Sequence, residues 1–362
     1  MAFPIGLLGV ATYLPPETRS NAWWPTATVE RWQRARLAAG PPPPLGELSA
    51  TMTRVLAALT AEAADPFHGV TQRHVMPAGM TALDMETHAA ERAIAHAQRH
   101  AGFSRDAIDA VLGHTAVPEY LMSNPAAVLH RALGLARRCL ALQVDASSYS
   151  FVAQLALAEQ MIASGRARHV LIVQSTAASR MIDPEAPLAP MFGDGASAAI
   201  VGRVSDGGLI ATVHHSNGSY PRALIASVPG GRWYDDGRTV LHSADPGHAR
   251  EVFLRNLDFA VDVVGDVLRE AGMAPGEIEF FAAHQGAPWL RRVTQEVLGL
   301  AQARSLDTFE TTGHLLSVSV PLVLETAQQR GLFARGDRVL LYAGGNGPTY
   351  GASVLRWGDP VA

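Results

Sequence analysis

Short apolar runs alternate with stretches of helical spacing along most of this chain. The run Cys139–Val144 has the length of a buried strand, and the residues after it place Phe151, Leu155 and Ile162 on one helical face. Small hydroxyl side chains crowd the junction between the two patterns. The first N–H groups of a helix lack backbone partners and lie at the positive end of the helix dipole, so they stabilise an anion. This junction is therefore either an Asp or Ser helix cap or the site of a nucleophile.

The same order of patterns occurs twice. Gly102–Pro118 aligns without a gap on Gly272–Pro288, which lies 170 residues later, and Arg166–Val173 aligns on Arg335–Tyr342, which lies 169 residues later. Each copy has the order strand, helix, strand, helix, strand. This order predicts two related α/β units, at residues 1–203 and 204–362, with largely parallel sheets covered by helices.

The first unit contains an insertion at about residues 35–66. Residues 40–46 are rich in proline, which predicts a stiff extended linker. Residues 48–64 have an amphipathic helical pattern with Met52 and Val55 on its apolar stripe. We expect this helix to pack on the surface or to act as a lid.

The repeat brings three polar side chains toward one place. In such sheets ligands bind at the carboxyl ends of the strands, and two facing copies share one crevice. The 169-residue offset sets Ser148 opposite Ser317 and Asp145 opposite His314, while His284 follows the predicted strand 278–283. We therefore expect Ser148, His284 and His314 to converge. His114, the repeat partner of His284, is expected to be structural.

Composition narrows the class of protein. Only 17% of the 362 residues are charged and the net charge is -4, so the sequence has no basic footprint for nucleic acid or an anionic membrane surface. The single Cys139 excludes an intramolecular disulfide, and no Cys or His spacing is typical of a metal site. No apolar run is long enough for a membrane span, and residues 1–14 lack the basic start of a signal peptide. We expect a cytoplasmic protein without a metal or cofactor.

Several spaced motifs resemble those of one known family. They are Gly69–Val75 (GVTQRHV), Phe192–Ala196 (FGDGA), His284–Gln285 (HQ), Gly313–Pro321 (GHLLSVSVP) and Gly344–Ala352 (GGNGPTYGA). Together they resemble the thiolase superfamily, and within it the β-ketoacyl-ACP synthase III (KAS III) group and its related acyltransferases. The resemblance implies an α/β thiolase-like fold in which two halves, related by a pseudo-twofold axis, form five α-β-α-β-α layers. It also implies a homodimer and acyl-CoA or acyl-carrier-protein thioesters as substrates.

The chain departs from the family pattern at the catalytic positions. Ser148 occupies the position of the family's nucleophilic Cys, and His314 that of its Asn. The HQAN motif becomes His284-Gln-Gly-Ala287. A serine hydroxyl requires a positioned base, here His284 or His314. The oxyanion is expected to be held by backbone N–H groups of Ser148, Gly345 and Gly347.

The acceptor of the acyl group decides between two enzymatic functions, and a third alternative involves no catalysis. With a hydroxyl or amine acceptor, the protein is a KAS III-like acyltransferase, which the resemblance links to natural-product biosynthesis. With a malonyl thioester, the two histidines would stabilise an enolate, and the product is a new C–C bond, as in the priming of a polyketide. The third alternative is a catalytically silent subunit that shapes a heterodimer.

Overall fold

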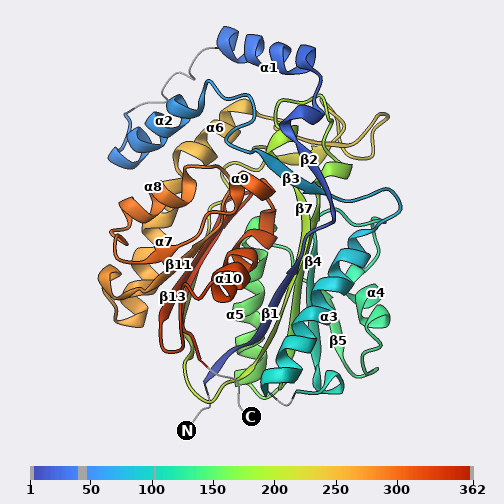
Figure 1. Cartoon of the computed structure of the whole chain (residues 1–362), viewed down its shortest axis with the longest axis vertical. Helices are drawn as coiled ribbons and strands as arrows, with labels where there is room; N and C mark the ends of the chain where they lie inside the picture. The colour runs from blue at the N-terminus through green and yellow to red at the C-terminus, as the bar shows by residue number, and fades with distance from the viewer. Residues whose placement is uncertain (1–3, 40–46, 102, 359–362) are drawn as a thin grey trace.

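Two five-stranded sheets form the framework of the described chain (Figure 1). The computed structural model describes residues 4–39, 47–101 and 103–358. The first sheet has the order β1 (Ile5–Tyr13), β7 (Asp194–Arg203), β6 (Val170–Ala177), β4 (Ala110–Thr115), β5 (Leu140–Gln143). The second, read from its other edge, has the order β8 (Gly208–Ser216), β14 (Thr349–Arg356), β13 (Arg338–Gly345), β11 (Phe280–Ala283), β12 (Arg304–Ser305). The two orders correspond strand by strand, so the repeat in the sequence is a repeat in the fold.

The prediction of largely parallel sheets was wrong for part of each sheet. β4 pairs with β5 and β6 in parallel, and β11 with β12 and β13, but β1, β7, β8 and β14 run antiparallel to their neighbours. Only residues 346–348 connect β13 to β14. A connection this short makes a hairpin and cannot cross over to a parallel strand.

Helices separate and cover the sheets. α5 (Ser150–Ala163) and α10 (Ser319–Gln329) lie between the two sheets, where Phe151, Val152, Val320 and Val323 belong to one buried apolar cluster. α3 (Ala82–Ala101) and α4 (Pro125–Ala132) cover the outer face of the first sheet. α7 (Asn256–Ala271) packs on the outer face of the second, with α8 (Leu290–Val297) beside it. The order of layers is therefore α-β-α-β-α, as predicted.

Two helices fall in this region: α1 (Thr26–Ala39) begins before the predicted insertion at about 35–66, and α2 (Ala50–Glu62) lies within it. The apolar stripe of α2 is buried against α6 (Pro246–Leu254), α7 and α8, in a cluster that contains Met52, Val55 and Trp289. The predicted surface-packed helix is thus present. The expected linker at residues 40–46 lies outside the described residues.

The remaining elements are short. Two ribbons pair β2 (Glu17–Ser20) with β3 (Gln72–Val75), and β9 (Ile225–Ser227) with β10 (Val240–His242). Single turns of helix include η3 (Ser147–Tyr149), η7 (Leu316–Val318) and α9 (Phe309–Thr312). Within the described ranges, no helix combines the length and apolar character needed to cross a bilayer.

Candidate active site

Ser148 lies in the turn that connects β5 to α5. The preceding residue, Ser147, has a positive φ of 54°, which is unusual for a residue with a side chain and bends the backbone sharply before the helix. Its counterpart in the second half, Leu316, has a φ of 49°. Both halves therefore make the same strained turn before a central helix, and Ser148 and Ser317 are buried at equivalent positions.

The capping of this turn is done by the neighbours of Ser148. A carboxylate oxygen of Asp145 accepts a hydrogen bond from the Ser147 N–H at 2.7 Å. The Ser150 hydroxyl accepts from the Ala146 N–H at 2.9 Å and donates to the Ser147 carbonyl at 2.7 Å. The interpretation as a cap thus holds for Asp145 and Ser150, while Ser148 lines a cavity and its role as a nucleophile stays a prediction.

Backbone contacts fix the two histidines. The His284 N–H donates to the Tyr342 carbonyl at 2.8 Å, which extends the β11–β13 pairing by one residue. The His314 N–H donates to the Met191 carbonyl at 2.6 Å. Gly313, just before His314, has a φ of 67°, and a Cβ there would lie 2.6 Å from the Met191 oxygen. Only glycine lets the His314 loop come this close.

The two imidazole rings meet through their Nε2 atoms, which lie 2.8 Å apart. Burial lowers the pKa of His284 to about 4. Burial, and then repulsion by the neighbouring His284, hold the pKa of His314 well below its ordinary value. Both rings are therefore neutral at pH 7. Two neutral rings joined in this way have one proton between the facing nitrogens: one Nε2–H donates, and the lone pair of the other Nε2 accepts.

Ser148, His284 and His314 line one cavity of about 290 Å³. Its wall comes from both halves and is mostly apolar. The side chains around it include Leu188, Met191, Phe192, Leu224, Val252, Phe253, Phe259, Trp289, Leu290, Tyr342 and Tyr350. The structure thus brings the three predicted side chains to one site, together with an apolar chamber.

Comparisons with known proteins identify the family. The model of 3-oxoacyl-[acyl-carrier-protein (ACP)] synthase III matches residues 142–218, and the model of its C-terminal part matches residues 268–357. A β-ketoacyl-[acyl-carrier-protein] synthase III of Coxiella burnetii (strain CbuK_Q154) is 30% identical over 292 residues, which are 80% of this chain and 88% of the relative. The chain belongs to the β-ketoacyl-ACP synthase III family. Its members are acyl-transferring or condensing enzymes.

Solved structures share the fold of this family member. The β-ketoacyl-ACP synthase III of Thermus thermophilus matches with a TM-score of 0.76 at 26% identity, covering 98% of this chain and 99% of that one. The priming β-ketosynthase of the R1128 polyketide pathway matches with a TM-score of 0.79 at 24% identity, covering 99% and 98%. A cysteine-to-serine variant of Xanthomonas campestris OleA, solved with lauric acid and lauroyl-CoA, matches with a TM-score of 0.75 at 18% identity, covering 99% and 100%. These matches confirm the predicted thiolase-like fold.

The predicted oxyanion residues of this synthase III family member lie differently around the cavity. Gly345 lines it next to Ser148, and a Cβ on Gly345 would lie 2.4 Å from the Ala146 carbonyl oxygen. Glycine there lets β13 approach the turn that holds Ser148. Gly347 lies in the β13–β14 turn, where its carbonyl accepts from the Gly218 N–H at 3.2 Å, and it is not among the residues that line the cavity. The role of both glycines stays a prediction.

His114 has partners that the sequence did not predict. Its Nδ1 lies 2.9 Å from the Ser317 hydroxyl, and its Nε2 lies 3.2 Å from an Asp145 carboxylate oxygen. A carboxylate only accepts, so Nε2 donates to Asp145, and in the neutral ring Nδ1 accepts from Ser317. His114, which was expected to be structural, bridges the turn of Ser148 to the turn that follows His314, and it is not among the residues that line the cavity. A contact between two halves leaves no signal in a local motif.

Sequence reasoning also missed the polar residues of the chamber wall, Ser243 and Asn256. Asn256 is the first residue of an amphipathic helix, and no motif distinguishes it from a helix cap. Cys139 is buried before β5, and burial raises the pKa of its thiol to about 11. The thiol is therefore almost fully protonated at neutral pH and is a poor nucleophile.

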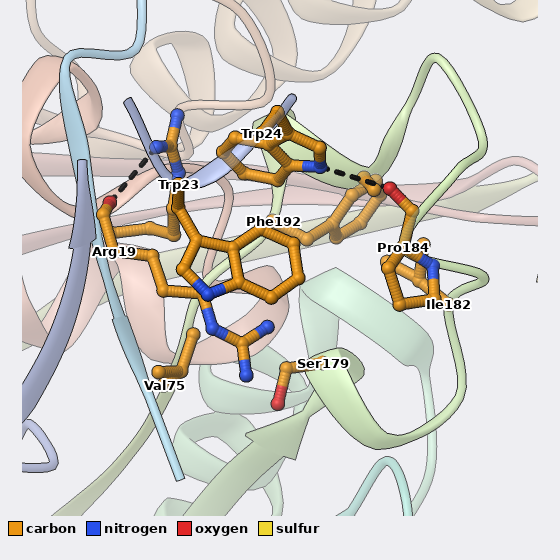
Figure 2. Close-up of a pocket in the computed structure, with 10 residues that line it drawn as sticks. Arg19, Trp23, Trp24, Val75, Ser179, Ile182, Pro184 and Phe192 are labelled. Carbon is orange, nitrogen blue, oxygen red and sulfur yellow. Dashed lines mark hydrogen bonds between the residues drawn. The ribbon is translucent and has the colours of Figure 1, made fainter. Parts of the chain in front are cut away.

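A second cavity shares Phe192 with the first (Figure 2). Arg19 lies over the Trp23 ring and Arg73 over the Trp24 ring, and the Trp24 Nε1–H donates to the Pro184 carbonyl at 2.9 Å. The Arg73 guanidinium donates to the carbonyls of Pro190 and Arg19 and to the Asn21 side chain. At about 20 Å³ the space holds little more than one water molecule, so this cluster is packing rather than a ligand site.

Proposed function

We propose that this protein is an acyltransferase that carries an acyl group as an ester on Ser148. The observation that supports it best is the pair of neutral histidines that lines one apolar cavity with Ser148. A serine hydroxyl needs a base that is unprotonated at neutral pH, and the unprotonated Nε2 of this pair would supply one once it turns from its partner ring. Membership of the synthase III family supports a thioester of a carrier protein or of CoA as the donor.

The reaction has two half-reactions. The Ser148 Oγ attacks the thioester carbonyl carbon, the C–S bond breaks, and the thiol leaves with the proton that the histidine pair took from serine. The acceptor hydroxyl or amine then attacks the ester carbonyl, the bond between that carbon and Oγ breaks, and Oγ regains a proton. In both steps the negative charge on the carbonyl oxygen would be stabilised by the N–H groups of Ser148 and Gly345.

Decarboxylative condensation is the second candidate, and membership of the synthase III family favours it. This reaction would use both Nε2–H groups as donors to one carbonyl oxygen. Two Nε2–H groups facing each other at 2.8 Å would repel, so an acceptor carbonyl would first have to separate the rings. We therefore rank transfer to a hydroxyl or amine first, with a role in natural-product biosynthesis.

Intact-mass measurement after incubation with a panel of acyl-CoA and acyl-carrier-protein thioesters tests the proposal. We expect one acyl adduct on the peptide that contains Ser148, lost in Ser148→Ala and kept in Ser147→Ala, whose hydroxyl is the adjacent one. Iodoacetamide should leave adduct formation intact, because the Cys139 thiol is buried and protonated. No adduct with any donor, or one on Cys139, would contradict the proposal.

Release of carbon dioxide separates the two enzyme candidates. Malonyl-ACP added to the acylated protein should release none if the acceptor is a hydroxyl or amine. A stoichiometric release would instead support condensation. A protein that forms no adduct alone but supports turnover when mixed with a homologous chain would support the silent subunit.

A further inference from the structure

The chamber next to Ser148 sets limits on the acyl group that the residue would carry, and this inference rests on the proposed function. Among the described residues that line the chamber there is no Arg, Asp or Glu. Burying a carboxylate without a cation or several hydrogen bonds is costly. The chamber therefore disfavours an acyl group with a free carboxylate, and favours an uncharged one.

The volume of the chamber sets the size of the group. An apolar cavity of about 150 Å³ holds a benzene ring. At about 290 Å³, this chamber holds a group roughly twice as large, about a dozen non-hydrogen atoms. Aromatic side chains form much of the wall, and the rings of Phe259 and Tyr350 stack with centroids 4.7 Å apart. An acetyl group would leave most of this space empty.

Several polar side chains interrupt the apolar wall, and two of their atoms lack a hydrogen-bond partner. The Oδ1 of Asn256 and the hydroxyl oxygen of Ser243 are buried and have no hydrogen-bond partner, although both residues line the chamber. In contrast, the Asn346 amide, also in the lining, donates to the Leu224 carbonyl. A buried polar atom without a partner is destabilising, and nearly all such atoms in proteins are paired. The two atoms have almost no surface open to the chamber, so a small rotation of either side chain would be needed to pair it with an occupant.

Asn256 is well placed to select that occupant. Its own backbone carbonyl accepts from the Tyr342 hydroxyl at 3.3 Å, and Tyr342 is the residue whose carbonyl fixes His284. Asn256 also begins α7, which α2 and α6 hold against the second sheet. Asn256 thus lines, from a supported position, the same chamber as His284 and His314.

We propose that the donor is an uncharged thioester of medium length or with a ring, whose acyl group carries a hydroxyl or similar hydrogen-bonding group, and that Asn256 is the specificity-determining residue for it. Ser243 offers a second contact. A site that hydrogen-bonds a substrate group discriminates strongly against the analogue without it, because its own buried polar atoms are then left unpaired. Chain length alone would give a much weaker preference.

Competition between donors of equal length tests this inference. Octanoyl-CoA, the series of its derivatives hydroxylated at carbons 3 to 8, and suberyl-CoA are offered to the protein, and the rate of the Ser148 adduct is followed by mass. We expect at least one hydroxylated donor to react about tenfold faster than octanoyl-CoA, the equivalent of one hydrogen bond, and suberyl-CoA to give no adduct.

Asn256→Leu keeps the size of the side chain and removes its hydrogen bonds, so it should bring the rate ratio close to one. Val252→Ala, which changes an apolar wall residue of the adjacent helix, should leave the ratio as it is. Octanoyl-CoA that reacts as fast as every hydroxylated donor in the unmodified protein overturns the inference while the Ser148 acyl-enzyme stands, and this arm needs no variant. Absence of any adduct on Ser148 overturns both.

Discussion

The chemistry of the site depends on the pairing of His284 with a second histidine. In the pair with His314, one Nε2–H and one Nε2 lone pair are engaged with each other, and a small movement of either ring would free the lone pair for a serine hydroxyl. Burial keeps both rings in their neutral forms, because it disfavours the charged forms. A base that is neutral well below pH 7 would remain available to a serine hydroxyl in mildly acidic conditions.

We therefore predict that acyl transfer persists to low pH. The acidic limb of kcat/KM should fall near pH 4 to 5, below the ordinary histidine pKa of about 6.5, because kcat/KM reports the free enzyme. A plot of kcat/KM against pH, with a donor that reacts at a rate independent of pH in solution, measures this. A limb centred near pH 6.5 would show that neither buried ring is the base.

The same pKa values predict how stability depends on pH. A histidine whose pKa is lower in the folded than in the unfolded state takes up a proton on unfolding. Its contribution to the free energy of unfolding is therefore complete above about pH 6.5 and is lost as the pH falls toward 4. For His284 the loss is on the order of 3 kcal/mol. Urea unfolding at pH 7, 6 and 5 should show it. His314→Asn should reduce the slope of the unfolding free energy against pH. An unchanged slope would contradict the lowered pKa that we assign to His314.

Gly286 controls the space above the two rings. A Cβ at this position would lie 3.4 Å from the His284 Cε1 and 3.8 Å from the His314 Nε2, which are ordinary contact distances. Gly286→Ala should therefore fold normally but slow transfer to the acceptor by about tenfold, because the methyl group takes the space beside the base. Thermal melts and single-turnover rates check both parts.

Gly265→Ala is a matched control for this substitution. Gly265 lies inside α7, and a Cβ there has no atom within 4 Å. The change should stabilise the helix by about 0.5–1 kcal/mol without slowing transfer. If Gly286→Ala and Gly265→Ala leave the transfer rate equally unchanged, the acceptor does not approach the histidines over Gly286.

At the scale of single residues, the sequence predicted which side chains converge on the chamber better than it predicted the residues that support them. Ser148, His284 and His314 are recognisable because they follow strands and occupy repeated positions. Asp145 and Ser148 were indistinguishable as caps, since both residue types cap helices and only the positive φ of Ser147 decides which side chain turns inward. The sequence could not single out Asn256, because the role proposed for it rests on an Oδ1 without a hydrogen-bond partner, which is visible only in three dimensions.

Between elements, the bridge from Asp145 through His114 to Ser317 joins the end of β5 to the start of η7. Hydrogen bonding to His114 lowers the pKa of Asp145 to about 2. The contribution of this carboxylate to the free energy of unfolding is present above about pH 4 and is lost as the pH falls toward 2. Because the bridge joins the turn of Ser148 to the turn that follows His314, we infer that it positions the proposed nucleophile against its base.

We predict that removing this bridge lowers kcat more than it changes KM. His114→Ala leaves the buried Ser317 hydroxyl without its acceptor, which should cost about 1–3 kcal/mol of unfolding free energy. His114→Gln retains a donor and an acceptor and should recover part of both losses. Steady-state kinetics with urea unfolding measures them. A loss of stability with kcat unchanged would make the bridge purely structural.

The arrangement of elements was predictable to the extent that the chain repeats itself. The matched segments fixed the equivalence of β4 with β11, β6 with β13 and the two central helices, and hence the facing turns. Strand direction was not predictable from periodicity, since β1, β7 and β14 are buried on both faces in antiparallel pairs, a pattern that buried parallel strands share. The packing of α2 behind Trp289 depends on distant contacts and left only an amphipathic pattern.

For the whole molecule, one edge of the first sheet is unusually apolar. β5 is the last strand of that sheet, and Leu140 and Leu142 on it are 46% and 43% exposed. Beside β5 lie α4, with exposed Val128, and the loop that contains Tyr120 and Met122, both largely exposed. An uncovered strand edge with apolar side chains favours pairing with another chain.

We predict that this edge pairs with the same edge of a second copy, so that two first sheets become continuous. An isologous contact of this kind forms a closed dimer. The exposed apolar side chains of both copies would then be buried away from water. Light scattering after size exclusion should give twice the chain mass of 38.4 kDa, falling to 38.4 kDa when Leu140 and Leu142 are both changed to Glu. Ile210→Glu, at a residue 41% exposed on the edge strand β8 of the second sheet, should leave the dimer intact. If Ile210→Glu breaks the dimer and the double substitution leaves it intact, the interface lies at β8. Different residues of the partner would then lie nearest the Ser148 turn.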